Sequence, residues 1–344
     1  MAEKPEISVV IASYNDFYNL FLLLSELYKS KHKNFEVVIV DDASKENLSL
    51  LKKIFPIRYF RNSKNQGAAI TRNAAAKKAR GDILISLDSD IKPLSDLPLV
   101  VHRYMRKHPQ TIAMTGFPGT GAENPSFFAR YKYLRDWSYW HIELDRSSFC
   151  YFRPAIGVIR RDIFLKLGGY DKRYCRPGVP AVEDLDFSYR LAKEGRILFN
   201  PAIVVGHPFG GLTKLLKSYF QRTALFFEIL KQKRLFSGVA TTRAEAITIL
   251  LAPFTLLSLI TSFFYPPAVF AFSVSLLTFL FRQRQFLRLC HKREGSLFTL
   301  GAFLTNWLLY LDIFAGAVYA IPFVLPKEGK KILNSLLKNN GSSE

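Results

Sequence analysis

Hydrophobic and polar positions follow two alternating patterns through the first part of the chain. Short β-branched runs predict strands, and segments with helical apolar spacing lie between them. The strand-like runs are 7–12, 35–40, 57–60 and 81–87, and the helix-like segments are 17–28, 47–55 and 67–79. Strands and helices that alternate with short polar connections are typical of a parallel sheet covered on both faces. We therefore expect an α/β domain in this part of the chain.

Polar clusters follow three of these strands. They are Ser13-Tyr14-Asn15, Asp41-Asp42 and Asp88-Ser89-Asp90. Right-handed crossovers bring the carboxyl ends of parallel strands to one edge of the sheet, where open α/β sheets bind ligands. Asp88 and Asp90 lie two residues apart, so in extended backbone their carboxylates face the same way and repel each other unless a cation or hydrogen-bond donors separate them. Hard oxygen ligands suit Mg²⁺ or Mn²⁺, and a solvated turn is the alternative interpretation.

The pattern becomes less regular in the next hundred residues. The predicted elements are a helix at 130–140, a strand at 155–159, a helix that ends at 167 and a helix at 182–193. The last of these begins with the acidic residues Glu183, Asp184 and Asp186. Acidic side chains in a first helical turn complement the helix dipole, so a purely structural role is one interpretation of this cluster.

The composition changes after residue 210. In the segment 212–236 basic residues alternate with Leu and Phe, as in an amphipathic helix on an anionic bilayer, although a solvated helix packed on the domain gives the same pattern. Apolar runs follow at 246–264, 268–281 and 297–325, the last with one charge, Asp312. Such runs predict membrane-spanning segments, the first two joined as a hairpin at Pro266-Pro267. The basic segments at 282–293 and 327–338 are expected to be a loop and a tail on the cytoplasmic side.

Charge and composition narrow the range of partners. The 344 residues include 48 Lys and Arg against 28 Asp and Glu, and the net charge of +20 favours anionic partners. The 30 phenylalanines and the positive mean hydropathy favour anionic membrane lipids over nucleic acid, so no nucleic-acid partner is expected. The three cysteines have no C-x-x-C spacing, and the N-terminus lacks the pattern of a signal peptide. We expect a reducing compartment, with the first half of the chain in the cytoplasm.

Six short motifs occur in the order typical of one enzyme family. They occupy residues 7–15, 40–44, 65–67 with 72–73, 88–90, 168–171 and 183–186. Over about residues 6 to 208 the chain resembles the family 2 glycosyltransferases of GT-A fold. The resemblance implies an α/β fold of the GT-A (Rossmann-like) type, a mainly parallel sheet flanked by helices and followed by an α-helical membrane domain. It places a nucleotide-sugar-binding catalytic domain at 1–210, a basic interfacial helix region at 211–240 and a transmembrane helical region at 241–344.

The resemblance also implies roles for the residues at the strand ends. The implied donor-binding residues are Ser13, Tyr14, Asn15, Asp42, Arg72, Asp88 and Asp90. The first four would hold the base and ribose of the nucleotide-sugar, and Arg72 would reach its diphosphate or base. Asp90 would bind Mg²⁺ or Mn²⁺, which neutralises the departing nucleoside diphosphate, and Asp88 would contact the ribose or a metal-bound water. From the residues alone, Asp42 can also be a helix cap and Arg72 a member of a surface ion pair.

Asp184 resembles the family's catalytic base, which takes the proton of the acceptor hydroxyl during an inverting transfer. Glu183 and Asp186 lie close in sequence, so which acid reaches the acceptor stays open, although Asp186 would face away on a helix. His207 follows a strand-like run and is either a further metal ligand, as in related GT-A enzymes, or a structural histidine. The segment 221–225 lacks the Trp of a Q-x-x-R-W motif, which favours transfer of a single sugar over processive synthesis.

These observations predict a membrane-bound, metal-dependent inverting glycosyltransferase that moves one sugar from a nucleotide-sugar donor to a hydroxyl of a lipid-linked or envelope glycan. We expect it at the cell membrane, with the catalytic domain in the cytoplasm. A polyprenyl-phosphate sugar synthase is the first alternative, but its acceptor is already an anion and needs no strong base, so the acidic motif at Asp184 counts against it. A non-catalytic basic membrane scaffold is the second alternative, and it leaves the strand-end acids unexplained.

Overall fold

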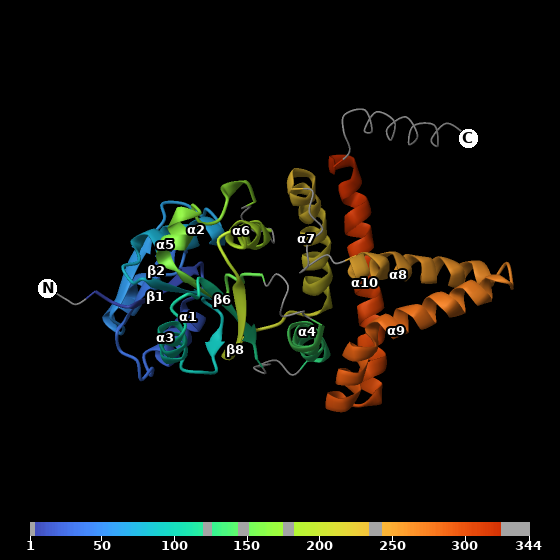
Figure 1. The fold of residues 1–344 in the computed structure, drawn as a ribbon, viewed down its shortest axis with the longest axis horizontal. Coiled ribbons are helices and arrows are strands. Elements are labelled where there is room, and N and C mark those ends of the chain that lie inside the picture. Colours follow the sequence, from blue (N-terminus) through green and yellow to red (C-terminus); the bar gives the residue numbers. More distant parts are fainter. Residues whose placement is uncertain (1–3, 120–125, 144–150, 175–181, 234–242, 325–344) are drawn as a thin grey trace. The chain divides into compact units, whose positions relative to one another are not determined.

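The computed structural model describes residues 4–119, 126–143, 151–174, 182–233 and 243–324, with backbone alone at Pro118 and at 227–233, 243–244 and 323–324. The predicted helical residues 234–236 and the predicted basic tail at 327–338 therefore lie outside the described residues. The chain forms two compact units that divide between Gly211 and Leu212. The first unit is an α/β domain, and the described part of the second consists of helices (Figure 1).

The described residues of the first unit form one sheet of eight strands. The strands are β1 (Ile7–Ser13), β2 (Phe35–Asp41), β3 (Ile57–Arg61), β4 (Ile83–Asp88), β5 (Lys92–Pro93), β6 (Ala113–Pro118), β7 (Ile156–Arg160) and β8 (Ile197–Gly206). Their order across the sheet is β3-β2-β1-β4-β7-β6-β8-β5. The four strands from β3 to β4 are parallel, whereas β7 runs antiparallel to both of its neighbours. The α/β class is confirmed, with a parallel first half and a mixed second half.

Neighbouring strands end level with one another at the carboxyl edge of the parallel half. Ser13 of β1 pairs with Asp41 of β2, and Ala12 pairs with Asp88 of β4. In the antiparallel pair of β5 and β8, Lys92 lies opposite Gly206, so the end of β8 lies beside the segment that follows β4. The topology therefore gathers the polar strand ends into one region.

Helices cover both faces of the sheet. They are α1 (Phe17–Leu27), α2 (Ala68–Lys78), α3 (Leu97–Lys107), α4 (Phe127–Ser138), α5 (Arg161–Lys166) and α6 (Glu183–Leu191), with short turns η1 (Leu48–Lys53), η2 (Tyr139–Glu143) and η3 (Lys172–Tyr174). Val9 and Ile11 of β1 pack in one core with α1 and α3, and Val10 packs in a second core with α2, α5 and α6. Strands buried on both faces require this alternation. Figure 1 shows α1 and α3 on one side of the strands and α2 and α5 on the other.

One segment of the first unit that the sequence predicts as an α-helix forms a different kind of helix. The segment 47–55 forms the 3₁₀ turn η1 rather than an α-helix. Pro56 follows at once, and a proline disfavours α-helical backbone in the residue before it. The connection between the parallel strands β2 and β3, residues 42–56, therefore contains a 3₁₀ turn and no α-helix.

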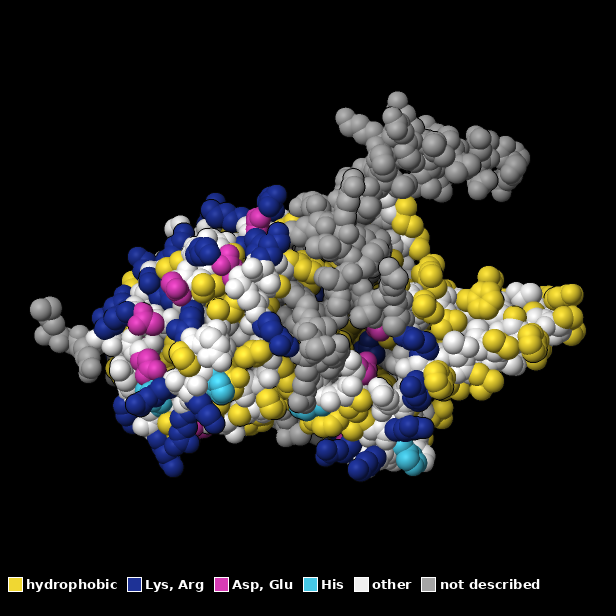
Figure 2. All heavy atoms as spheres, viewed as in Figure 1, with side chains coloured by type: hydrophobic (Ala, Val, Ile, Leu, Met, Phe, Trp, Pro, Cys, Tyr) yellow, Lys and Arg dark blue, Asp and Glu magenta, His cyan; other side chains and the backbone are white. Residues whose placement is uncertain are grey.

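Long helices make up the described part of the second unit. They are α7 (Leu212–Lys233), α8 (Arg243–Ser262), α9 (Ala268–Glu294) and α10 (Ser296–Val324). Among the described residues, Glu245–Ser262 and Ser296–Pro322 are the two helical segments long and apolar enough to cross a membrane. Large apolar side chains of α8 and α9, including Phe254, Leu257 and Phe270, are exposed, and Figure 2 shows these apolar side chains along both helices.

The basic segment 282–293 is part of α9, which corrects the prediction of a loop there. Phe286, Leu289 and Cys290 of this segment are buried, while its basic residues stay exposed. An apolar stripe at helical spacing continues the helix, and charge alone does not end it. The helix ends at Gly295, whose φ of +85° is readily adopted by glycine.

The helix α7 packs against α10 within the second unit. A Cβ atom at Gly316 would lie 2.8 Å from the backbone oxygen of Phe220, so the absence of a side chain permits the close approach. The rings of Phe220 and Tyr319 lie 5.5 Å apart between centroids. Lys214 and Lys217 remain exposed near the start of α7. The helix therefore combines a packed apolar face with a basic exposed one.

Candidate functional site

Two carboxylates and one imidazole meet at the carboxyl edge of the sheet. Asp88 ends β4, Asp90 lies two residues further on, and His207 directly follows β8. One ligand atom from each residue lies within 4.8 Å of the others, a spacing that one metal ion can bridge. Burial raises the pKa of Asp90, the charges of Asp88 and Asp16 add to the rise, and His207 opposes it. Carboxylate oxygens suit Mg²⁺ and Mn²⁺, and the imidazole nitrogen shifts the preference towards Mn²⁺.

Arg72 of α2 carries a buried positive charge beside these carboxylates. Its guanidinium forms an ion pair with Asp88, and its Nη1 lies 3.9 Å from Oε1 of Glu183. Burial lowers the pKa of Arg72, but the charge of Asp88 and its other neighbours raises it by more, so the group stays charged. Its Nε is buried without a hydrogen-bond partner among the described residues, and a bound anion would satisfy this donor. The arginine is therefore not the surface ion pair of the alternative interpretation.

Asp42, directly after β2, holds the segment that leads into α2. Its Oδ1 accepts a hydrogen bond from the Gln66 N–H at 2.9 Å, and its Oδ2 accepts one from the Gly67 N–H at 2.8 Å. The local turn after β2 is capped by Asp41, whose Oδ1 accepts from the Ser44 N–H at 2.8 Å. A carboxylate oxygen accepts two hydrogen bonds, so Oδ2 of Asp42 keeps one acceptor position for a ligand.

The turn Ser13-Tyr14-Asn15 is tied to the turn after β2. Asn15 has a φ of 50°, its N–H donates to Ser44 Oγ at 2.8 Å, and its Oδ1 accepts from the Lys45 N–H at 2.6 Å. Within the described part of the chain, Ser13 Oγ is buried and has no hydrogen-bond partner, whereas Tyr14 is 47% exposed. The turn thus holds one buried hydroxyl and one exposed aromatic ring at this edge.

The acidic start of α6 lies beside Arg72, and its three acids have different partners. Asp184 is buried, and its Oδ2 accepts a hydrogen bond from the Tyr151 hydroxyl at 3.2 Å. Asp186 forms an ion pair with Arg190 of the same helix, with 2.9 Å between Oδ2 and Nε. The structure therefore gives Asp186 a structural contact on α6.

Three residues of this region receive no individual role from the sequence: Asp16, Tyr151 and Tyr170. The Oδ2 of Asp16 accepts from Ser89 Oγ at 2.6 Å and so joins the turns after β1 and β4. Tyr170 is buried, and burial together with the charges of neighbouring acids raises its pKa, while Arg72 opposes the rise. Asp16 directly follows the first polar cluster, Ser13-Tyr14-Asn15, so the sequence contains a signal for its place at the site. The local sequence of Tyr151 contains no such signal.

Comparison with known proteins identifies a domain in the first unit. Residues 8–168 match the model of glycosyl transferase family 2. An uncharacterized glycosyltransferase of Haemophilus influenzae is 42% identical over 189 residues, which are 55% of this chain and 62% of that protein. The uncharacterized glycosyltransferase YwdF of Bacillus subtilis is 28% identical over 212 residues, which are 59% of this chain and 74% of that protein. Residues 8–168 are therefore a family 2 glycosyl transferase domain, as the motifs predict.

Two further comparisons concern the length of the relatives and the fold of the chain. The chain spans 62% of the Haemophilus influenzae protein and 26% of the glycosyltransferase YfnE of Bacillus subtilis. The mannosyltransferase PcManGT from Pyrobaculum calidifontis, solved in complex with GDP-Man and Mn²⁺, shares the fold with a TM-score of 0.56 at 17% identity. That match covers 93% of this chain and 88% of the mannosyltransferase, and it confirms the predicted GT-A fold.

Proposed function

We propose that this chain is a membrane-bound inverting glycosyltransferase that moves one sugar from a nucleotide-sugar to a hydroxyl of a lipid-linked or envelope glycan. The observation that carries the proposal is the meeting of Asp88, Asp90, His207 and Arg72 at the sheet edge of a family 2 domain. Two carboxylates, an imidazole and a buried guanidinium are suited to a diphosphate that is held through a divalent cation.

The nucleoside part of the donor would bind along the turns after β1 and β2. Tyr14 offers an exposed ring on which a base can stack, and Ser13 offers a hydroxyl without a protein partner among the described residues. The remaining acceptor position of Asp42 Oδ2 suits a base N–H or a ribose hydroxyl. Asn15 fixes the conformation of the turn through its two hydrogen bonds to residues after β2.

A divalent cation would be held by Asp88, Asp90 and His207. When bound, it neutralises charge on the nucleoside diphosphate as that group leaves the sugar. The presence of Mn²⁺ and GDP-Man in the solved mannosyltransferase supports this assignment, as does the imidazole in the donor set. Arg72 would add a fixed positive charge, because Asp88 and its buried surroundings keep the guanidinium in place.

Asp184 would act as the general base. In the reaction the acceptor oxygen forms a bond to the anomeric carbon, the bond from that carbon to the diphosphate oxygen breaks, and the hydroxyl proton moves to the carboxylate. The hydrogen bond from Tyr151 orients this carboxylate at the start of α6. Asp186 is a poorer candidate because its carboxylate pairs with Arg190.

The second unit would hold the enzyme at the cytoplasmic face of the cell membrane. Two helical segments have the length and composition of spans, and the exposed lysines of α7 suit anionic lipid headgroups. An acceptor with a lipid tail is confined to the bilayer, so attachment of the enzyme there restricts the search to two dimensions.

Mass spectrometry of the product tests the proposal. Purified protein is incubated with a panel of nucleotide-sugars, Mn²⁺ and a lipid extract, beside Asp184→Asn and the control Asp82→Asn on the exposed surface. We expect a singly glycosylated product from the wild type and the control, and a loss of at least about a hundredfold in rate for Asp184→Asn. A polyprenyl-phosphate synthase would keep most of its rate in that variant, and a scaffold would form no product with any donor.

A further inference from the structure

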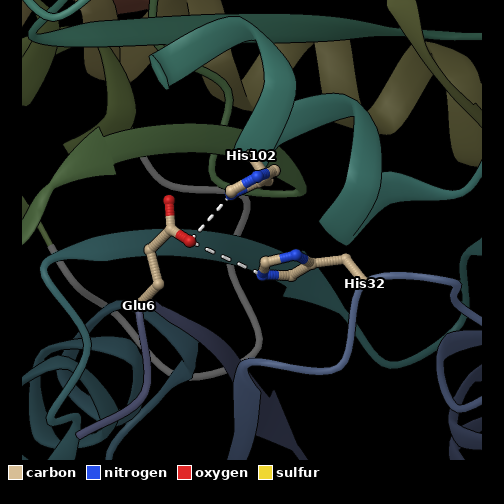
Figure 3. Close-up of side chains that lie close together, drawn as sticks. All are labelled: Glu6, His32 and His102. Atoms are coloured by element: carbon tan, nitrogen blue, oxygen red, sulfur yellow. Dashed lines mark hydrogen bonds and ion pairs between the residues drawn. The ribbon is translucent and has the colours of Figure 1, made fainter.

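A second group of metal-ligating side chains lies away from the carboxyl edge of the sheet. Glu6 directly precedes β1, His32 lies between α1 and β2, and His102 lies in the middle of α3. Figure 3 shows the three side chains pointing towards one another from these separate elements. The Nδ1 of His102 lies 2.7 Å and the Nε2 of His32 lies 3.7 Å from the same carboxylate oxygen, Oε2 of Glu6. One ligand atom from each lies within 4.8 Å of the other two.

The surrounding structure fixes the backbone segments that carry these three side chains. The backbone oxygen of Glu6 accepts hydrogen bonds from the N–H groups of Asp82 at 3.0 Å and Ile83 at 3.2 Å, which anchors it to the start of β4. Asp96, the N-cap of α3, accepts from the Lys31 N–H at 2.8 Å and also from the Ser30 hydroxyl. The loop that carries His32 is therefore joined to the helix that carries His102, and a prearranged scaffold of this kind is what a metal site requires.

One ligand atom of the group has no hydrogen bond. The Nε2 of His32 is buried and has no hydrogen-bond partner in the described part of the chain, although it faces the carboxylate of Glu6. The rings of His32 and His102 stack with 4.3 Å between centroids and 24° between their planes, so one ring has to turn for both nitrogens to point at the same ion. A buried polar nitrogen without a partner destabilises the fold, and a bound ion would remove this cost.

We infer that Glu6, His32 and His102 form a binding site for one transition-metal ion of the zinc type. Two imidazole nitrogens and one carboxylate oxygen are three of the ligands that Zn²⁺ prefers, with bonds of about 2.0–2.2 Å. Ligands around a tetrahedral ion are then about 3.3 Å apart, and the observed 2.7 and 3.7 Å lie on either side of this value. Rotation of one imidazole out of the stack, with small movements of the other side chains, brings the three atoms to that spacing and directs them at one ion. The site lies at the opposite edge of the sheet from the cluster of Asp88, Asp90 and His207.

Positive charges beside this group oppose the binding of any cation. His32 and His102 line a hollow of about 650 Å³ together with five basic side chains, Lys31, Lys33, Arg103, Arg106 and Lys107. These charges repel every divalent cation, so the site requires an ion that forms strong bonds to imidazole nitrogen, such as Zn²⁺, and Mg²⁺ does not meet this requirement. The same charges favour an anion or hydroxide at the coordination position that three protein ligands leave open.

Metal titration of the full-length protein tests the site. The protein is purified with a tag that lacks histidine, stripped with a chelator and titrated with Zn²⁺ against a chromophoric chelator. The substitutions Asp90→Ala and His207→Gln are present throughout, so that the carboxyl-edge cluster does not bind the ion. We expect one Zn²⁺ per chain. Its affinity should be at least about a hundredfold weaker in His102→Gln and in His32→Gln, because removing a ligand lowers the metal affinity more than removing a residue that only supports a ligand.

Three further variants separate metal binding from a structural role. His108→Gln, at the end of the same helix, should bind Zn²⁺ as before. His102→Cys should restore binding, since a thiolate is also a zinc ligand, and should add a sulfur charge-transfer band to the spectrum of the Co²⁺ form. Asp96→Asn should weaken binding about tenfold or more by loosening the loop. Absence of a Zn²⁺ site in the titration, or equal Zn²⁺ affinity with and without His32 and His102 while circular dichroism shows a folded chain, would overturn the inference.

Discussion

At the scale of single residues, Asp90 is the most sensitive position of the proposed donor site. Its carboxylate lies with Asp88 and His207 within one cluster, and burial raises its pKa. A cation between these groups would relieve the repulsion between the two carboxylates. We therefore predict that sugar transfer stops in excess EDTA and returns with Mn²⁺. Asp90→Asn should lower the rate on the order of a hundredfold or more, as measured from initial rates at saturating Mn²⁺. Full turnover in EDTA would contradict the assignment.

Glu36 gives a pH prediction for the stability of the fold. Its Oε1 accepts from Ser8 Oγ at 2.7 Å, and its Oε2 forms ion pairs with Arg58 at 3.1 Å and Arg80 at 3.0 Å. Burial alone would raise its pKa, but the hydrogen bonds from Ser8 and Arg80 and the charge of Arg58 lower it below 4.5 overall. A folded pKa below the unfolded one means that the carboxylate stabilises the protein above about pH 4.5, and that this stabilisation disappears as the pH falls through the folded pKa.

Glu36→Gln should therefore lower the free energy of unfolding of the first unit by about 1–3 kcal/mol at pH 7. The difference in unfolding free energy between the variant and the wild type should shrink below about pH 4.5. Urea unfolding at about pH 7 and at a pH below about 4.5 measures this change. Asp82→Asn, on the exposed surface, is the matched control and should change stability little. A destabilisation of equal size at both pH values would show that Glu36 acts through shape and not through charge.

At the scale of elements, α7 packs on α10 with one face and exposes basic side chains that would attach to a membrane surface. One of its faces packs on α10 at Gly316, and Lys214 and Lys217 remain exposed. Each basic side chain near an anionic surface contributes about 1 kcal/mol. We predict that Lys214→Gln with Lys217→Gln slows transfer to a lipid acceptor by up to roughly thirtyfold when the protein is reconstituted in vesicles that contain anionic lipid. Hydrolysis of the donor by water should stay near normal.

The matched control for this experiment is Lys52→Gln with Lys53→Gln, on exposed positions of η1 in the first unit. It removes the same charge without altering α7 and should leave transfer to the lipid acceptor nearly unchanged. Equal loss of lipid transfer and donor hydrolysis in the α7 variant would mean that this helix belongs to the catalytic fold, and the membrane-docking role would then be wrong.

At the scale of the whole molecule, the first unit contains both of its own hydrophobic cores and every proposed donor-binding residue. A truncated protein that ends at Gly211 should therefore fold and bind nucleoside diphosphate in Mn²⁺ with an affinity within about tenfold of the full chain. Calorimetry measures the binding, and circular dichroism shows whether the truncated protein is folded. A folded truncated protein without nucleotide binding would mean that the second unit completes the donor site.

The parts of this fold that local pattern decides are predictable from the sequence, and the parts that depend on distant contacts are not. The strands β1 to β4 follow from β-branched runs, and their polar ends indicate the site. The hydrogen bond from Gly67 to Asp42 and the ion pair of Arg72 with Glu183 each join two separate elements, and no local sequence pattern specifies them. For the same reason the meeting of Glu6 with His102 leaves no signal, because 96 residues separate them in sequence.

The central claim is that the carboxyl edge of the sheet is a nucleotide-sugar donor site, and calorimetric titration of nucleoside diphosphates onto the full-length protein tests it most directly. In Mn²⁺ we expect the wild type and the control Asp82→Asn to bind one nucleoside diphosphate with equal affinity. Arg72→Lys should bind at least about tenfold more weakly because a planar, paired guanidinium is lost, and Asp90→Asn should lose the dependence of binding on Mn²⁺. Affinity that is unchanged in both variants, with the protein folded, would contradict the account.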